Sequence, residues 1–435
     1  MKFSLSKKHI SLAPIIIAAT LIFIGIVHYG VNTPFWDEWE MVPLFQHYDH
    51  HMLSIGDLWR QHNEHRIFFP NAVLLIMAYV THWNIGAEIV LSFILSLISV
   101  SLIYKMMTVR IKNSVLAILG TFFLGFWFYS PVQWENWSWG WQIEWFLCIA
   151  AILTSIYLLD RLGSAKRMGT REKTRFIGAI FAAVIASFSL GSGIIVWVVG
   201  IITIILYRQR RRIIAYWVSA GVLTTGLYYY HYHKPGGPSV LTFIHQPVGF
   251  CKYVLEFFGR PVSDNIDVSR ILGAILISLL IPIAGILWFN RRNLNKFIPW
   301  LALISLPIMV SLMTAVSRLG FGVEQGMASR YTAFSLLYII GVSGIFLLAI
   351  DTGRISKQKT VLTILISIAV VLPLLISSYK NGVNGWRVRS AYMRVVESCT
   401  HQDHPSNQCL SMTYPDPNIA RERLTYVKQK HWAGY

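Results

Sequence analysis

The chain has 435 residues, of which 54% are hydrophobic and only 13% are charged, and its formal net charge is +18. Because soluble domains carry roughly 25% charged residues, this composition excludes a protein whose main solvent is water. The basic residues gather in short clusters between long apolar stretches, which favours a membrane protein over one that binds nucleic acid.

The first apolar stretch, Leu12 to Val27, follows a basic start with Lys2, Lys7 and Lys8. A secretory signal peptide has the same pattern, but no small-residue cleavage site precedes the aromatic pair Phe35-Trp36. We therefore expect this stretch to be retained as a signal anchor, with the N-terminus in the cytoplasm.

The later apolar stretches are separated by further basic clusters, which mark the cytoplasmic side by the positive-inside rule. The stretches approach the roughly 20 residues that a helix needs to cross about 30 Å of hydrocarbon. The sequence thus predicts an all-α, polytopic transmembrane helical bundle in a bacterial inner membrane, with about 11 spans and a periplasmic C-terminus. The expected crossings are Ser11–Gly30, Gly86–Tyr104, Ser114–Ser130, Ile143–Leu159, Phe176–Leu190, Gly193–Tyr207, Ile213–Tyr230, Arg270–Phe289, Phe297–Val316, Tyr331–Ile350 and Thr360–Ser378.

Two apolar segments test this topology. The run from Phe176 to Tyr207 would be about 48 Å long as one helix, so we expect a hairpin that turns at Gly191 and Gly193. The segment Ile67 to Val80 is shorter, and counting it as a span would move the basic cluster at Arg161 to Arg175 outside. We therefore expect a partly inserted or interfacial helix there.

The chain divides into a transmembrane domain over residues 1–378 and a short periplasmic tail over residues 379–435. The domain includes a first periplasmic loop at 31–83, which we expect to carry interfacial helices. Cys399 and Cys409 lie in the tail, where an oxidising periplasm allows them to form a disulfide. No repeat of fixed period, like those of many transporters, is visible.

The first loop begins with two adjacent acids, Asp37 and Glu38, between aromatic residues at the membrane surface. Tryptophan is expected at such an interface, whereas a pair of carboxylates is not required there. An apolar aromatic surrounding makes a carboxylate a competent base. The alternative is a solvated acidic turn, and we favour Asp37 and Glu38 as catalytic residues.

A dense polar run follows in the same loop. Asn63, Glu64 and His65 offer hydrogen-bonding groups to a sugar or phosphate, and the guanidinium of Arg66 suits a bidentate grip on phosphate oxygens. The alternative for each residue is a place on the polar face of a surface helix. Several loop side chains could ligate a metal, but without a recognised ligand spacing they are expected to be solvated, and no metal site is predicted. These are His47, Asp49, His50, His51, His62 and His65.

Two later outer segments carry further candidates. Trp134, Glu135 and Gln142 belong to a Trp-rich segment that mixes flat apolar rings with hydrogen-bonding groups, as carbohydrate sites do. The alternative is an interfacial aromatic belt. Arg330 stands where a helix begins at the outer surface, which favours an anion site over a side chain that snorkels to lipid headgroups.

One span, a large outer loop with an acidic pair and a surface helix, and then many spans resemble the C-type (GT-C) glycosyltransferases. Protein O-mannosyltransferases and lipid A aminoarabinose transferases are members of that superfamily. The resemblance is anchored on Asp37-Glu38 and, more loosely, on His65 to Pro70. The chain lacks the His-Pro-Pro sequence of the protein mannosyltransferases there, which leaves the subfamily open.

The resemblance implies that Asp37 is the catalytic carboxylate, with Glu38 as its partner or alternative. An acceptor hydroxyl would lose its proton to Asp37 as it attacks the anomeric carbon, and the lipid phosphate would leave with inversion. Arg66 and Arg330 would stabilise that departing charge.

The resemblance therefore implies a membrane glycosyltransferase that moves a sugar from a polyprenyl-phosphate donor to a glycan, lipid or protein acceptor at the periplasmic face. No nucleic acid and no cofactor is expected, and a divalent metal remains possible without support from the sequence. A transporter or flippase of lipid-linked sugars is the main alternative, but it should place charges within its spans, whereas polar residues here collect outside them. A non-catalytic envelope-assembly protein is the third reading.

Overall fold

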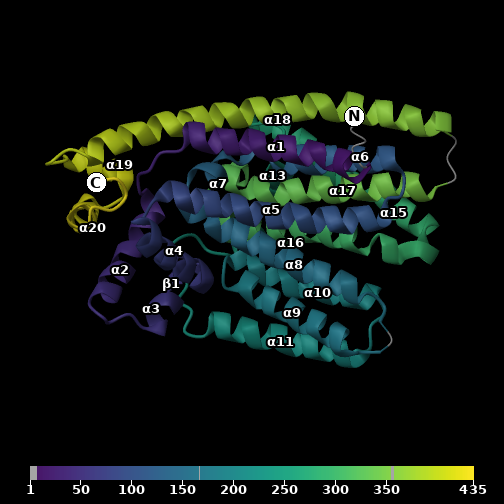
Figure 1. Ribbon diagram of the computed structural model, residues 1–435, viewed down its shortest axis with the longest axis horizontal. Coiled ribbons are helices and arrows are strands. Elements are labelled where there is room, and N and C mark those ends of the chain that lie inside the picture. The colour runs from purple at the N-terminus through teal and green to yellow at the C-terminus, as the bar shows by residue number, and fades with distance from the viewer. Residues whose placement is uncertain (1–6, 166, 354–356) are drawn as a thin grey trace, which may run out of the picture.

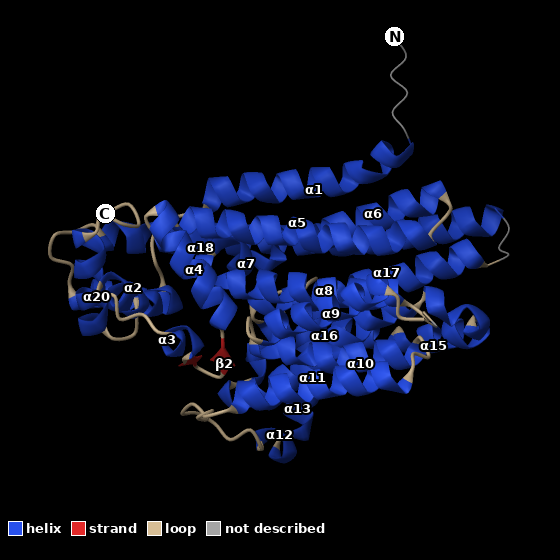
Figure 2. Cartoon of the chain, turned by 60° about the horizontal axis from the view of Figure 1, so that its bottom comes forward, coloured by secondary structure: helices blue, strands red, loops and turns tan. Residues whose placement is uncertain are grey.

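The computed structural model describes residues 7–165, 167–353 and 357–435, and that part of the chain is almost entirely helical (Figure 2). The strands among these residues are β1 (Gln61–His62) and β2 (His65–Arg66), a short antiparallel pair that places His62 opposite His65. The prediction of an all-α polytopic bundle is confirmed.

Long helices run beside one another along the bundle, and the shorter ones gather mostly at one end (Figure 1). The bundle helices are α1 (Lys7–Tyr29), α5 (Ile85–Arg110), α6 (Ser114–Phe128), α8 (Ile143–Leu162), α9 (Thr170–Ser187), α10 (Ile195–Leu206), α11 (Arg211–Tyr229), α14 (Ile266–Ser278), α15 (Leu280–Phe289), α16 (Ile298–Arg318), α17 (Thr332–Thr352) and α18 (Lys357–Thr400). The other α-helices are α2 (Val42–Asp49), α3 (Ile55–Trp59), α4 (Phe68–Thr81), α7 (Trp134–Ser138), α12 (Thr242–His245), α13 (Pro247–Gly259), α19 (Asn407–Thr413) and α20 (Pro417–Gln429). The 3-10 helices are η1 (Trp36–Met41), η2 (Pro131–Gln133), η3 (Gly140–Gln142), η4 (Gly191–Ile194), η5 (Arg291–Lys296), η6 (Leu319–Phe321), η7 (Val323–Met327) and η8 (Ser329–Tyr331).

Among the described residues, seven helical segments are each long and apolar enough to cross a membrane. They are Leu12–Tyr29, Ile85–Arg110, Ser114–Ser138, Gly140–Leu162, Ile266–Phe289, Ile298–Phe321 and Ser329–Thr352. The other four crossings expected from the sequence fall on helices as well. Three correspond to α9, α10 and α11, which are shorter or begin with charged residues, and the fourth lies in α18, where many side chains are outside the described set.

The hairpin expected between Phe176 and Tyr207 is present as α9 and α10, which pack together through a hydrogen bond from Trp197 Nε1 to Ser187 Oγ of 3.0 Å. A Cβ at Gly193 would lie 1.8 Å from the carbonyl oxygen of Ala186. Only glycine permits this close approach, and the break in the long apolar run follows from it.

The segment expected to be interfacial forms α4, a short apolar helix that packs between the first loop and the bundle. It ends at His82, whose backbone is in the left-handed region with φ of 55°. Its position in the membrane interface stays a prediction.

The C-terminal residues fold against the first loop. Helix α18 continues through residues 378 and 379 without a break, and Cys399 and Cys409 are disulfide-bonded as expected, with their Cα atoms 5.8 Å apart. After α18, the chain turns back toward α2 through α19, which carries Cys409, and α20 (Figure 1). The tail therefore folds at the end of the bundle that carries the first loop, which we call the loop end.

Candidate active site

Two adjoining cavities lie at the loop end of the bundle. The Asp37 cavity has a volume of about 640 Å³ and is lined by the first loop, the start of α8 and the ends of α11 and α16. The Arg389 cavity has a volume of about 680 Å³ and is lined by η1, α7, α18 and residues that follow α13. Trp36, Trp139 and Arg330 line both cavities and form the boundary between them.

The cavities collect most of the residues that the sequence predicts for the site. Asp37, Asn63, Glu64, His65 and Gln142 line the Asp37 cavity, Trp134 and Glu135 line the Arg389 cavity, and Arg330 lines both.

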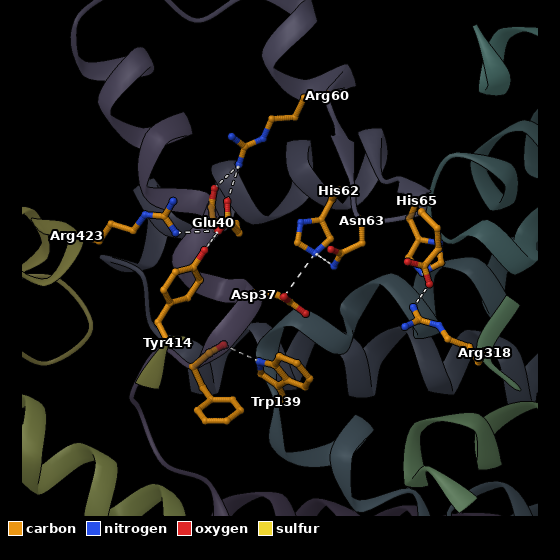
Figure 3. Close-up of polar contacts among 12 residues, drawn as sticks. Asp37, Glu40, Arg60, His62, Asn63, His65, Trp139, Arg318, Tyr414 and Arg423 are labelled. Atoms are coloured by element: carbon orange, nitrogen blue, oxygen red, sulfur yellow. Dashed lines mark hydrogen bonds and ion pairs between the residues drawn. The ribbon is translucent and has the colours of Figure 1, made fainter. Parts of the chain in front are cut away.

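Asp37 is presented by η1, which begins at Trp36 with a φ of +49°. A bulky residue rarely adopts this backbone conformation, and such strain concentrates at functional sites. The Oδ1 atom of Asp37 lies 3.6 Å from Nε2 of His62, which is long for a direct hydrogen bond (Figure 3). The carboxylate is one-third exposed, so it can meet a ligand.

Glu38 lies behind this site and lines neither cavity. Its carboxylate is buried and accepts hydrogen bonds from the backbone N–H of Phe35, at 2.6 Å, and of Trp141, at 3.2 Å. Burial raises the pKa of Glu38 to about 8. Because both oxygens are engaged with the backbone, Glu38 joins η1 to the Trp-rich segment and is poorly placed as the alternative base.

The turn between β1 and β2 carries Asn63 and Glu64 into the Asp37 cavity, and His65 follows them. Glu64 forms an ion pair with Arg318 at the end of α16. Burial lowers the pKa of His65 to about 4, so this side chain is neutral near pH 7. Its ring lies against Gly191, where a Cβ would be 2.5 Å from Nδ1.

Arg66 does not occupy the position expected for a phosphate ligand. Its guanidinium is buried and donates to the backbone carbonyl oxygens of Trp59, Tyr228 and Tyr230. These bonds tie the first loop to the end of α11 and leave few donors for a substrate. Arg66 also lines neither cavity, so we assign it to the scaffold.

Arg330 and Glu135 form a pair at the boundary of the cavities. The Glu135 carboxylate accepts from the backbone N–H of Arg330 at 2.8 Å and from its Nη1 at 3.4 Å. Asn136 donates to the carbonyl oxygen of Arg330 at 3.0 Å. The Trp-rich segment thus fixes the start of α17, and with it the direction of the Arg330 side chain.

The structure adds three functional candidates that the sequence reasoning missed, Glu144, Arg260 and Arg389. Glu144 lines the Asp37 cavity at 6% exposure, and its Oε2 has no hydrogen-bond partner among the described residues. An ionisable residue at the start of an apolar span is a signal for function that could have identified it. In the described ranges, no group of three or more His, Cys, Asp and Glu side chains is arranged to hold a metal ion.

No family model matches the sequence, and no curated protein sequence matches it. Among solved structures, the chain is similar to the archaeal oligosaccharyltransferase AglB from Archaeoglobus fulgidus in complex with an inhibitory peptide and a dolichol-phosphate. The identity is 13% and the TM-score is 0.44, over 92% of this chain and 59% of that one. The Archaeoglobus fulgidus oligosaccharyltransferase in complex with Zn and sulfate is 14% identical with a TM-score of 0.44, over 89% of this chain and 56% of that one. The same enzyme tethered to an acceptor peptide is 12% identical with a TM-score of 0.42, over 95% of this chain and 58% of that one. The chain thus spans less than two thirds of the length of each of these structures.

Proposed function

We propose that this protein is a membrane glycosyltransferase that moves a sugar from a polyprenyl-phosphate donor to a hydroxyl of an envelope glycan, lipid or protein. The observation that carries the proposal is the meeting of two cavities at Trp36, Trp139 and Arg330, with Asp37 facing one of them. Transfer between two substrates requires two spaces that join at the reacting bond, and this arrangement supplies them.

Asp37 acts as the general base in the proposed reaction. The acceptor oxygen forms a bond to the anomeric carbon while its proton passes to the Asp37 carboxylate, and the bond from that carbon to the phosphate oxygen breaks. Attack and departure on opposite faces of the sugar give inversion. The imidazole of His62 lies beside the carboxylate, with its Nε2 atom 3.6 Å from Oδ1 of Asp37.

The aromatic residues around Asp37 suit a sugar ring. Trp36, Trp139 and Trp141 line the Asp37 cavity, and Gln142 and Glu144 bring hydrogen-bonding groups to the same space. Flat apolar faces combined with a few convergent polar groups are typical of small-molecule sites. The proposal therefore assigns the transferred sugar to the boundary at Trp36 and Trp139.

Arg330 stabilises the charge that develops on the departing phosphate. Its pairing with Glu135 holds the guanidinium at the boundary of the two cavities before the substrate arrives. Donors that are already oriented toward a developing charge stabilise the transition state without reorganisation.

The membrane topology in this proposal has the N-terminus in the cytoplasm and the active site in the periplasm, at the outer surface of the inner membrane. The disulfide between Cys399 and Cys409 supports an oxidising compartment for the loop end of the bundle. A donor whose phosphate stays at the interface and whose tail stays in hydrocarbon can reach a site at this depth.

The test is transfer of labelled sugar from a panel of polyprenyl-phosphate sugars to envelope acceptors, in membranes that contain matched amounts of each variant. Asp37→Asn is expected to lower the rate by about 10²- to 10⁴-fold, the usual contribution of general acid–base catalysis. Asp403→Asn, which changes an exposed acid in the loop between α18 and α19, is the matched control and should transfer at the wild-type rate. Full activity of Asp37→Asn would overturn the role of Asp37, and no transfer by the wild type from any donor would overturn the proposed function.

A further inference from the structure

One face of α18 forms a wall of the Arg389 cavity. The lining positions recur at spacings of three and four residues, so they lie along a single stripe of the helix. They are Asn381, Asn384, Gly385, Val388, Arg389 and Tyr392. This stripe lies in the part of the chain expected to be a tail, and nothing in the proposed reaction yet uses it.

Arg389 is held in a fixed position in that stripe. Its guanidinium carbon lies 4.0 Å from the centre of the Phe35 ring and 5.8 Å from that of Trp139. Its Nε atom is buried without a hydrogen-bond partner among the described residues. A cation that contacts two aromatic rings is thus present at the cavity, and one of its donors has no partner.

Arg260, at the end of α13, faces the same cavity from another element. It is 7% exposed, and its Nε donates to the carbonyl oxygen of Met327 at 2.8 Å. Its Nη1 is buried and has no partner in the described part of the chain. A buried donor without a partner is unfavourable unless a ligand completes it.

The other cations that line the two cavities are Arg318, Arg330 and Lys234. Lys234 is exposed and donates to the carbonyl oxygen of Pro238 at 3.3 Å, whereas the two arginines are in ion pairs. Arg330 is bound by Glu135, and Arg318 is bound by Glu64. Arg260 and Arg389, in contrast, form no ion pair within 4.0 Å in the described ranges.

The acids near these two arginines do not neutralise them. Asp264 lines the cavity but is exposed and forms no ion pair within 4.0 Å with either arginine, and Glu135, which also lines it, is engaged by Arg330. Glu38 lies behind the cavity with both oxygens bonded to backbone N–H groups. Among the cations that line the two cavities, the buried donors without a partner therefore belong to Arg260 and Arg389, in the Arg389 cavity.

We infer that Arg260 and Arg389 bind a phosphoryl oxyanion in the Arg389 cavity, and that this anion is the phosphate of the lipid-linked donor. The inference rests on the proposed function and deepens it, because it assigns a substrate to each cavity. Asp37 lines only one cavity and Arg389 only the other, with Trp36 and Trp139 between them. The acceptor then enters the Asp37 cavity, and base and leaving group stand on opposite sides of the sugar.

Binding of farnesyl phosphate to the purified full-length protein in detergent tests this inference, with farnesol and inorganic phosphate as comparison probes. The wild type should bind farnesyl phosphate and not farnesol. Arg389→Gln and Arg260→Gln should each weaken this binding at least about tenfold, in line with the strength of charge-assisted hydrogen bonds. Arg387→Gln is the matched control, since Arg387 is exposed on the same helix and lines neither cavity. Melting curves of each variant, and Arg389→Lys, separate loss of a ligand contact from loss of the fold.

Unchanged affinity in folded Arg389→Gln and Arg260→Gln would overturn the inference. Inorganic phosphate that binds as tightly as farnesyl phosphate would overturn the assignment to a lipid-linked donor. The two proposals fail separately. If the wild type transfers sugar but neither arginine variant changes the affinity for farnesyl phosphate, the inference alone is wrong. If binding depends on the arginines but the wild type transfers sugar from no donor, the proposed function is wrong.

Discussion

The first loop contains two acidic regions that the structure treats in opposite ways. At Glu40 and Asp49 the carboxylates are closed off by the C-terminal residues. Glu40 accepts from Arg423 at 2.9 Å, and Asp49 accepts from Lys430 at 2.6 Å. The hydroxyl of Tyr414, before α20, also donates to Glu40, and that of Tyr426, in α20, donates to Asp49. We name this region the clamp. At Asp37, three residues before Glu40, the carboxylate has His62 at 3.6 Å and opens to a cavity.

The difference separates acids that build the structure from acids that can act on a ligand. Figure 3 shows Glu40 between Arg60 and Arg423, while Asp37 points to His62. A carboxylate with its lone pairs filled by permanent donors holds two segments together but is unavailable for a substrate proton. We therefore expect variants of the clamp to change stability and variants around Asp37 to change turnover.

The largest expected effect comes from comparing Asp37→Asn with Glu40→Gln. Asp37→Asn should lower the transfer rate by about 10²- to 10⁴-fold with an unchanged melting temperature, because general base catalysis is lost and no buried ion pair is broken. Glu40→Gln should leave the rate within a few-fold of wild type and destabilise the fold by roughly 1–3 kcal/mol, since Arg423, Arg60 and Tyr414 all lose their charged partner. Transfer assays and thermal unfolding of the same preparations measure both. Equal loss of rate and stability in both variants would erase the distinction between the two regions.

The next effect concerns Trp432, which anchors the clamp. Its ring packs edge-on against Phe45 and Tyr79, with centroid distances of 5.3 and 4.9 Å. Trp432→Ala should cost about 3–5 kcal/mol of unfolding free energy, as other buried large-to-alanine changes do. Denaturant unfolding in detergent measures it, and Trp288→Ala, at an exposed position of α15, should be near neutral. A small effect at Trp432 would mean that the C-terminal residues are only loosely attached.

How much of this could be predicted from the sequence depends on the range of the interactions. The helical bundle, the turn at Gly191 to Gly193 and the disulfide follow from apolar length, local glycines and compartment chemistry. The sequence also directed attention to Asp37 and Arg330, because each is a charged residue beside an expected membrane surface.

The roles of Arg66 and Glu38 could not be predicted, because their partners are distant or are backbone atoms. Arg66 donates to carbonyl oxygens more than 160 residues away, on Tyr228 and Tyr230, and no side-chain pattern marks such acceptors. Arg389 was missed for a related reason. Arg389 lies in a segment that the sequence predicts to be a polar tail. Only the packing of α18 against the bundle turns one face of this helix toward the cavity.

The pH dependence of stability sharpens the comparison, because two acids of η1, Glu38 and Glu40, have pKa values that are shifted in opposite directions. Burial raises the pKa of Glu38 to about 8, so the folded state binds more protons than the unfolded state between about pH 4.5 and 8. Stability should fall as pH rises through that window, by at most about 1.4 kcal/mol per pH unit. Burial alone would raise the pKa of Glu40, but hydrogen bonds from Tyr414 and Arg423 hold this pKa below its ordinary value. The clamp should therefore lose stability only when the pH falls below the ordinary pKa of a glutamate.

Unfolding measured from pH 3 to 9 tests this, roughly the range over which both carboxyls titrate. Glu38→Gln should flatten the alkaline side of the curve, and Glu40→Gln the acidic side. The reverse assignment of the two variants would contradict the burial and hydrogen bonding described for these acids.

The smallest expected effect is that of Arg423→Gln. The ion pair from Arg423 to Glu40 is partly exposed, and Tyr414 still donates to the Glu40 carboxylate when the guanidinium is gone. Such pairs contribute about 0–1 kcal/mol, so stability should change little, and the transfer rate should be that of the wild type. The informative outcome would be a large loss of rate with intact folding. Because Glu40 and Asp37 share the six-residue helix η1, that result would mean that the clamp also sets the position of Asp37, and the two regions would then act as one.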